Sequence, residues 1–131
     1  HGSTLHIISN TVPLLFLSWT LFLFYQSIGT KVFLICYFVT HVLIGLVARP
    51  SMHVGASGIV YCIASVLIFY GFFSRDMRSI MISLIIILLF GGLVVGLMPN
   101  QPGVSWESHL IGALVGASTA FFYARQAHES K

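Results

Sequence analysis

The sequence predicts an all-α membrane protein, a polytopic bundle of transmembrane helices. Of its 131 residues, 57% are hydrophobic and only 7% are charged, whereas a water-soluble domain carries about 25% charged residues. The apolar residues also fall into runs of about 20, the length of helix that spans a bilayer core. These spans are expected to be helices rather than strands, because a segment in lipid must satisfy its backbone hydrogen bonds internally.

Five apolar runs divide the chain, and short polar breaks separate them. The first run is followed by "QSIGTK", the second by "ARPSMHVG", the third by "FSRDMRS" and the fourth by "MPNQPGVSWES". Gly, Pro, Asn and Ser in such breaks are typical of turns. The sequence has no repeat and no soluble linker, so we expect one domain over residues 1–131. The expected spans are 5–26, 32–48, 56–73, 79–98 and 108–124.

The basic residues predict how the spans are oriented. Five Lys and Arg residues follow the first, third and fifth spans, whereas the other side has only Arg49. Because positively charged loops stay on the cytoplasmic side, these three spans are expected to run inward and the C-terminus to be cytoplasmic. The expected location is a bacterial cell membrane, with an organelle membrane as the alternative. The five residues are Lys31, Arg75, Arg78, Arg125 and Lys131.

The scattered basic residues, the cysteines and two of the histidines do not indicate a binding site. The net charge of +3 does not predict a nucleic-acid partner, because the basic residues form no patch. Cys36 and Cys62 lie inside apolar runs, where we expect packed thiols rather than a disulfide or metal ligands. His41 lies within the second span and is expected to bond to another helix. His53 falls in the loop before the third span.

Polar side chains lie at the start of three spans that are expected to run in the same direction. Ser57 opens the third span and His109 opens the fifth. His6 and Asn10 lie at the start of the first span, four residues apart and therefore on one helix face. Because the three starts reach the same depth near the outer surface, residues that are distant in sequence are expected to converge there.

Small residues would allow the third and fifth spans to pack closely. The stretch "HLIGALVG" places Gly112 and Gly116 four residues apart, a GxxxG pair that admits a close neighbour. Gly58, beside Ser57, offers the same space on the third span. A close approach of the two helices would bring the Ser57 hydroxyl near the His109 ring.

The pairing of Ser57 with His109 suggests nucleophilic catalysis. Serine becomes nucleophilic when a base within hydrogen-bond reach takes its proton, and histidine suits that role near neutral pH. The helix N-terminus at Ser57 supplies free backbone N–H groups for an oxyanion, and His6 and Asn10 add side-chain donors. Tyr61, one turn after Ser57, would pack on the imidazole. No carboxylate lies on the right face, so we expect a Ser–His dyad without an acidic member.

These motifs resemble those of the rhomboid family of intramembrane serine proteases. "HGSTLHIISN" (1–10) is similar to the family pattern H-G-x-x-x-H-x-x-x-N, "GASG" (55–58) to the G-x-S-G nucleophile motif, and "SHLIGALVG" (108–116) to H-x-x-G-x-x-x-G. The resemblance covers nearly the whole chain, from the family's second transmembrane helix to its sixth. It implies that the first helix of the core is absent from this sequence.

The resemblance also implies a role for each residue. Ser57 would be the nucleophile, His109 the base and Tyr61 its packing partner. The oxyanion region would contain His6 and Asn10, with His1 in support. The small residues of the motifs are Gly55, Gly58, Gly112 and Gly116.

The implied substrate is a transmembrane segment of another membrane protein. Cleavage is expected where that segment unwinds and has a small residue. The fourth span would gate lateral entry from the lipid bilayer, and residues 98–108 would cap the site. No metal and no organic cofactor is implied.

Three alternative interpretations stay open. In the first interpretation, Ser57 and its glycine neighbours only pack helices together. In the second, the chain is a rhomboid-like scaffold that binds transmembrane helices without cutting them, although such relatives typically lose the serine or the histidine. In the third, a metal transporter would use His1, His6, His53 and His109, but no intramembrane carboxylate lines a path.

Overall fold

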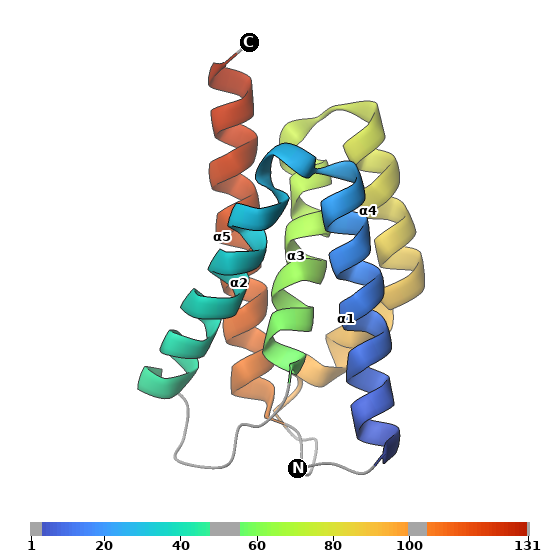
Figure 1. Ribbon diagram of the computed structural model, residues 1–131, viewed down its shortest axis with the longest axis vertical. Helices are drawn as coiled ribbons and strands as arrows, with labels where there is room; N and C mark the ends of the chain where they lie inside the picture. Colours follow the sequence, from blue (N-terminus) through green and yellow to red (C-terminus); the bar gives the residue numbers. More distant parts are fainter. Residues whose placement is uncertain (1–3, 48–55, 100–104, 131) are drawn as a thin grey trace.

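The computed structural model describes residues 4–47, 56–99 and 105–130, which form five α-helices and one 3₁₀-helix (Figure 1). These residues contain no strand, which confirms the all-α prediction. The elements are α1 (Thr4–Phe24), α2 (Gln26–Val47), α3 (Ser57–Ser74), α4 (Met77–Phe90), η1 (Gly91–Leu97) and α5 (Trp106–Glu129).

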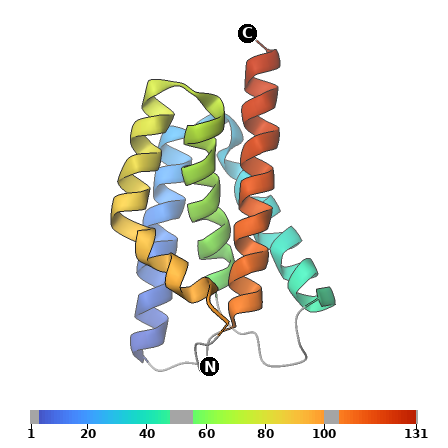
Figure 2. The same cartoon turned by 180° about the vertical axis from the view of Figure 1, so that it is seen from behind.

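Successive helices alternate in direction, so α1, α3 and α5 begin at the same end of the bundle (Figures 1 and 2). We call this end, which includes Ser57 and His109, the site end. The opposite end, which includes Arg75, Arg78 and Arg125, is called the basic end. The central helix is α3, because it contacts α1, α2, α4 and α5 and most of its residues are buried.

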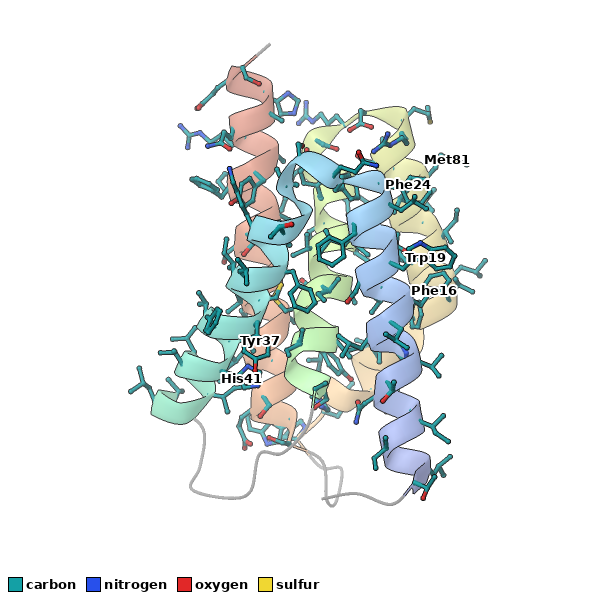
Figure 3. All side chains as sticks on the ribbon, viewed as in Figure 1. Phe16, Trp19, Phe24, Tyr37, His41 and Met81 are labelled. Carbon is teal, nitrogen blue, oxygen red and sulfur yellow. A yellow bond between two sulfur atoms is a disulfide. The ribbon has the colours of Figure 1, made fainter. Side chains whose placement is uncertain are left out.

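Four of the helical segments are long and apolar enough to cross a membrane. Large apolar side chains, such as Trp19 and Met81, cover their outward faces (Figure 3), a surface suited to lipid rather than water. Helix α5 has 24 residues but carries Glu107 and Arg125 near its ends, so its crossing stays a prediction. The four segments are Ile7–Phe24, Gln26–Val47, Ser57–Ser74 and Met77–Leu97.

The predicted break at 26–31 was wrong, because α2 already begins at Gln26 and only Tyr25 separates it from α1. The turn is tight and favours Gly29, since a Cβ there would lie 3.1 Å from the Phe22 ring. Arg78 of α4 donates a hydrogen bond to the Phe24 carbonyl oxygen at the end of α1. Its guanidinium also lies 5.8 Å from the centre of the Tyr25 ring. These contacts replace the longer loop that the polar residues suggested.

Two other boundaries differ from the prediction. The fourth span is not one α-helix, because the chain tightens into the 3₁₀-helix η1 at Gly91. Glycine pairs favour such a change, since Gly91 and Gly92 are poor α-helix formers. The fifth span extends past 124 to Glu129, where an ion pair from Arg125 to Glu129, 3.1 Å long, joins successive turns of α5.

Two side-chain predictions, one for the two cysteines and one for His41, were also wrong. Cys36 and Cys62 are not packed thiols but form a disulfide between α2 and α3, with their Cα atoms 5.6 Å apart. His41 does not bond to another helix; its Nδ1 lies 2.6 Å from the Tyr37 carbonyl oxygen of its own helix, and its side chain is exposed (Figure 3). The sequence could not show which face of α2 meets α3.

The turn between α3 and α4 is held by Asp76, the N-cap of α4. Its carboxylate accepts a hydrogen bond from the Ser79 backbone N–H at 2.9 Å. Burial alone would raise the pKa of Asp76, but the hydrogen bond from Ser79 and the charge of Arg78 hold this pKa below its ordinary value. The cap is therefore ionised at neutral pH.

Helices α3 and α5 make the most extensive contact in the bundle, and glycine permits it. A Cβ on Gly112 would overlap the carbonyl oxygen of Gly58, and a Cβ on Gly116 would lie 2.7 Å from the Cβ of Ser65. The Ser65 hydroxyl donates a hydrogen bond to the Ala113 carbonyl oxygen at 2.7 Å, which joins the two backbones further. The helices are in backbone contact where they cross.

We predict that Gly112→Ala destabilises the protein by about 1–3 kcal/mol, because the added methyl group forces two backbones apart. Gly45→Ala is the matched control, since nothing lies within 4 Å of a Cβ at that position of α2. Thermal unfolding in detergent, followed by circular dichroism, measures both. Equal unfolding temperatures for the two variants would contradict the close crossing.

Candidate active site

Ser57 is the first residue of α3 and is only partly buried. The first hydrogen bond of the helix runs from the Val60 N–H to the Ala56 carbonyl oxygen, at 3.0 Å. The backbone N–H groups at the start of α3, including that of Ser57, therefore have no acceptor within the helix. Within the described residues no side chain caps them, so they can donate to a negatively charged oxygen at the site end.

His109 lies in the first turn of α5 and its ring packs against Tyr61. The two ring centroids are 4.1 Å apart, and the ring planes are nearly parallel at 12°. Tyr61 is buried in the core. Because Tyr61 is one turn after Ser57, this stack fixes the imidazole beside the start of α3.

Two carbonyl groups of η1 complete the surroundings of the His109 ring. The His109 Nδ1 lies 2.8 Å from the Gly96 carbonyl oxygen, and the Tyr61 hydroxyl donates to the Leu93 carbonyl oxygen at 2.5 Å. Since a carbonyl oxygen can only accept, Nδ1 must carry the proton of this hydrogen bond. In the neutral ring, Nε2 is then unprotonated and is the nitrogen that can act as a base.

The crossing of α3 and α5 places Ser57 and His109 on either side of a close contact. A Cβ on Gly58 would lie 3.6 Å from the Ser108 carbonyl oxygen, so the residues next to Ser57 and His109 nearly touch. Within the described residues, however, no hydrogen bond joins the Ser57 hydroxyl to the His109 ring. Catalytic hydrogen bonds are often formed only when substrate is bound.

The remaining predicted site residues are only partly described. Asn10 is half-buried in the first half of α1, at the site end. His6 belongs to the same helix, but its side chain lies outside what the structure describes. The other predicted residues outside the described ranges are His1, His53 and Gly55.

The part of the chain that the structure describes contains no group of three or more His, Cys, Asp or Glu side chains that could hold a metal ion. The ring nitrogen Nδ1 of His109 is already engaged by Gly96. Three of the histidines considered for a metal site, His1, His6 and His53, have side chains outside the described part.

Sequence reasoning missed the contribution of η1. A Cβ on Gly96 would overlap the Tyr61 hydroxyl and would lie 3.0 Å from the His109 Nδ1. Glycine is therefore required for the backbone to approach both rings. The stretch "FGGLVVG" indicates a departure from a regular α-helix, because three glycines in one apolar run weaken the helix. It does not show which carbonyl groups contact the two rings.

A polytopic helix bundle with a serine at one helix start and a histidine on the adjoining helix defines a class of membrane protein with a candidate Ser–His site. A family model described as "Rhomboid domain" matches residues 1–126, and the chain belongs to the rhomboid family. No solved structure gives a significant match.

The relatives come from mycobacteria. The uncharacterized proteins Rv1337 of Mycobacterium tuberculosis and Mb1372 of Mycobacterium bovis are each 34% identical to this chain over 130 residues, covering 92% of it and 54% of the relative. The uncharacterized protein ML1171 of Mycobacterium leprae is 30% identical, with 92% and 51% covered. The chain thus spans about half the length of these curated relatives, whose names state no activity.

We predict that Gly96→Ala releases the His109 ring from η1, whereas Gly92→Ala does not. A methyl group at Gly96 would displace Tyr61 and His109, but nothing lies within 4 Å of a Cβ at Gly92. Nitrogen-15 NMR of labelled histidine, assigned with His109→Ala, measures the tautomer. The Nδ1–H form should dominate in the wild type and in Gly92→Ala, and decline in Gly96→Ala. The same tautomer in all three proteins would contradict the contact.

Proposed function

We propose that this protein is an intramembrane serine endopeptidase that hydrolyses peptide bonds in or near transmembrane segments of other membrane proteins. One observation carries the proposal: the His109 ring is held by Tyr61 and Gly96 with Nε2 as its basic nitrogen, on the helix that crosses α3 beside Ser57. Membership of the rhomboid family supports it.

In the proposed mechanism, the Ser57 Oγ attacks the carbonyl carbon of the peptide bond while the His109 Nε2 takes the hydroxyl proton. The backbone N–H of Ser57, with the side chains of His6 and Asn10, stabilises the oxyanion. His109 then gives its proton to the leaving amine, and the acyl group stays on Ser57. Water, deprotonated by His109, releases the new carboxylic acid and restores the serine.

The Gly96 carbonyl takes the place that an aspartate has in a catalytic triad. It accepts the Nδ1–H bond, which keeps His109 in the useful tautomer and orientation. A neutral carbonyl stabilises the positively charged imidazolium less than a carboxylate does. We therefore expect a slow protease, whose rate depends on how well the substrate is positioned.

The site end is proposed to face the outside of the cell, because the Lys and Arg residues gather at the basic end. Ser57 and His109 are both partly exposed, so that water can reach them. A substrate would enter from the bilayer past α4 and η1. It must present an unwound peptide bond, since a helical backbone keeps its carbonyl groups in hydrogen bonds.

A second candidate function is a scaffold that binds transmembrane helices without cutting them. The observation that favours it is the lack, within the described residues, of a hydrogen bond between Ser57 and His109. A protein without a nucleophile–base contact could still recognise a helix through its exposed apolar faces.

We expect a fluorophosphonate probe to label the folded protein in detergent at Ser57. Ser57→Ala should abolish labelling, and His109→Ala should slow it by at least about 100-fold, because the base is lost. Ser118→Ala is the matched control, since Ser118 is exposed on α5 far from the site end. Mass spectrometry of the labelled peptide identifies the serine.

Two outcomes would decide between the candidate functions. Labelling that needs Ser57, His109 and the native fold would support the protease, and synthetic transmembrane substrates would follow. A folded wild-type protein that stays unlabelled would refute it and would make the scaffold the leading account.

A further inference from the structure

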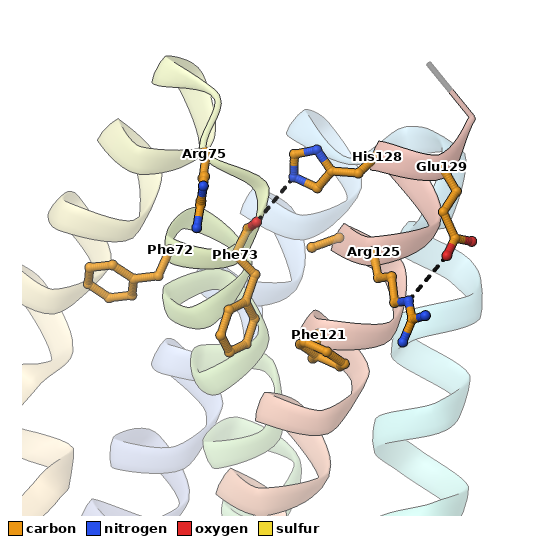
Figure 4. Close-up of a pocket in the computed structure, with 8 residues that line it drawn as sticks. Phe72, Phe73, Arg75, Phe121, Arg125, His128 and Glu129 are labelled. Carbon is orange, nitrogen blue, oxygen red and sulfur yellow. Dashed lines mark hydrogen bonds and ion pairs between the residues drawn. The ribbon is translucent and has the colours of Figure 1, made fainter.

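A groove of about 590 Å³ lies between the ends of α3 and α5 at the basic end (Figure 4). It is at the opposite end of these helices from Ser57 and His109, so the proposed protease does not use it. Its lower part is aromatic and its rim carries charged groups.

The aromatic part is formed by phenylalanines from both helices. Phe73 and Phe121 meet edge to face, with ring centroids 5.5 Å apart. Phe72 also lines the groove. Both Phe72 and Phe121 are more than half exposed. This surface is suited to a hydrocarbon chain.

Among the described residues, one cation of the charged rim has no protein partner. Arg125 is paired with Glu129 at 3.1 Å, and the His128 Nε2–H donates to the Phe73 carbonyl oxygen at 3.3 Å. Arg75 also lines the groove, and within the described part of the chain its guanidinium has neither an ion pair nor a hydrogen bond. The groove therefore has an exposed positive charge among its lining residues.

The backbone of Arg75 has an unusual conformation for a residue with a side chain. Arg75 ends α3 in the left-handed conformation, with φ of 63° and ψ of 11°, and no other described non-glycine residue has a positive φ. Glycine is the residue favoured at this position of a helix end. An arginine in this conformation is disfavoured relative to glycine, and such residues cluster at functional sites.

We propose that the groove binds an anionic phospholipid of the cytoplasmic leaflet. The phosphate contacts Arg75, with Arg125 as a second cation, and one acyl chain lies against Phe73 and Phe121. The arrangement of apolar and charged groups along the groove matches a phospholipid. The aromatic surface lies toward the middle of the bundle, and the cations lie at its end. The inner leaflet holds the anionic lipids, which attract arginines at the membrane surface.

The binding test uses the natural protein in dodecyl maltoside micelles, with dioleoyl phosphatidylglycerol or the zwitterionic dioleoyl phosphatidylcholine added at equal mole fraction. We expect phosphatidylglycerol to raise the unfolding temperature more than phosphatidylcholine does. Native mass spectrometry measures the bound lipid. Removing one arginine contact should weaken phosphatidylglycerol binding about fivefold, which corresponds to about 1 kcal/mol.

Arg75→Gly separates a structural role from a binding role. Because glycine suits the left-handed backbone, this variant should unfold at the same or a higher temperature without lipid, yet lose most of the rise with phosphatidylglycerol. Lys31→Gln is the matched control, since it removes one exposed cation from α2 outside the groove. Lys31→Gln should keep the full rise in unfolding temperature with phosphatidylglycerol.

Three results would overturn the proposal. A full rise in unfolding temperature with phosphatidylglycerol in Arg75→Gly would remove Arg75 from the site. Equal losses in Arg75→Gly and Lys31→Gln would show general attraction to charge rather than a site. Inorganic phosphate that reproduces the rise without lipid would show a site for a free anion. None of these readouts depends on proteolysis, so the failure of one proposal leaves the other standing.

Discussion

The backbone contact between α3 and α5, where Gly112 faces Gly58, determines where the candidate nucleophile Ser57 and the candidate base His109 lie. Side chains larger than hydrogen at Gly112 would push the two helices apart. Because Ser57 precedes Gly58 and His109 lies one turn before Gly112, the same contact brings the serine and the histidine to one depth and one side of the bundle. The hydrogen bond from Ser65 to Ala113 holds the crossing deeper in the core. Packing and the proposed chemistry thus depend on the same few glycines.

The change from α4 to η1 adds the second constraint. Gly96 lies in the last turn of η1, where carbonyl groups lack a partner within the helix. Its carbonyl oxygen accepts from His109, while that of Leu93 accepts from Tyr61. We propose that substrates enter past η1. The same segment sets the tautomer of His109. A substrate that displaced η1 would disturb the base until the segment closed again, which links entry to reactivity.

The bilayer explains why much of the fold could be predicted. Span length and polar breaks gave five helices, and alternating direction placed the starts of α1, α3 and α5 at one end. What failed depends on helix rotation and local packing: the Cys36–Cys62 disulfide, the outward position of His41 and the one-residue turn at Tyr25. The carbonyl partners of His109 and Tyr61 were also missed, because a glycine in a sequence does not reveal which backbone oxygen it exposes.

The most direct measurement is an experimental structure of the protein after reaction with a small fluorophosphonate. The account predicts a phosphonyl group on the Ser57 Oγ, with its oxygen toward the N-terminus of α3. It also predicts the His109 Nε2 within hydrogen-bond reach of that group while Nδ1 stays on the Gly96 carbonyl oxygen. A structure in which the His109 ring points away from the modified serine, or in which α3 and α5 no longer touch at Gly58 and Gly112, would contradict it.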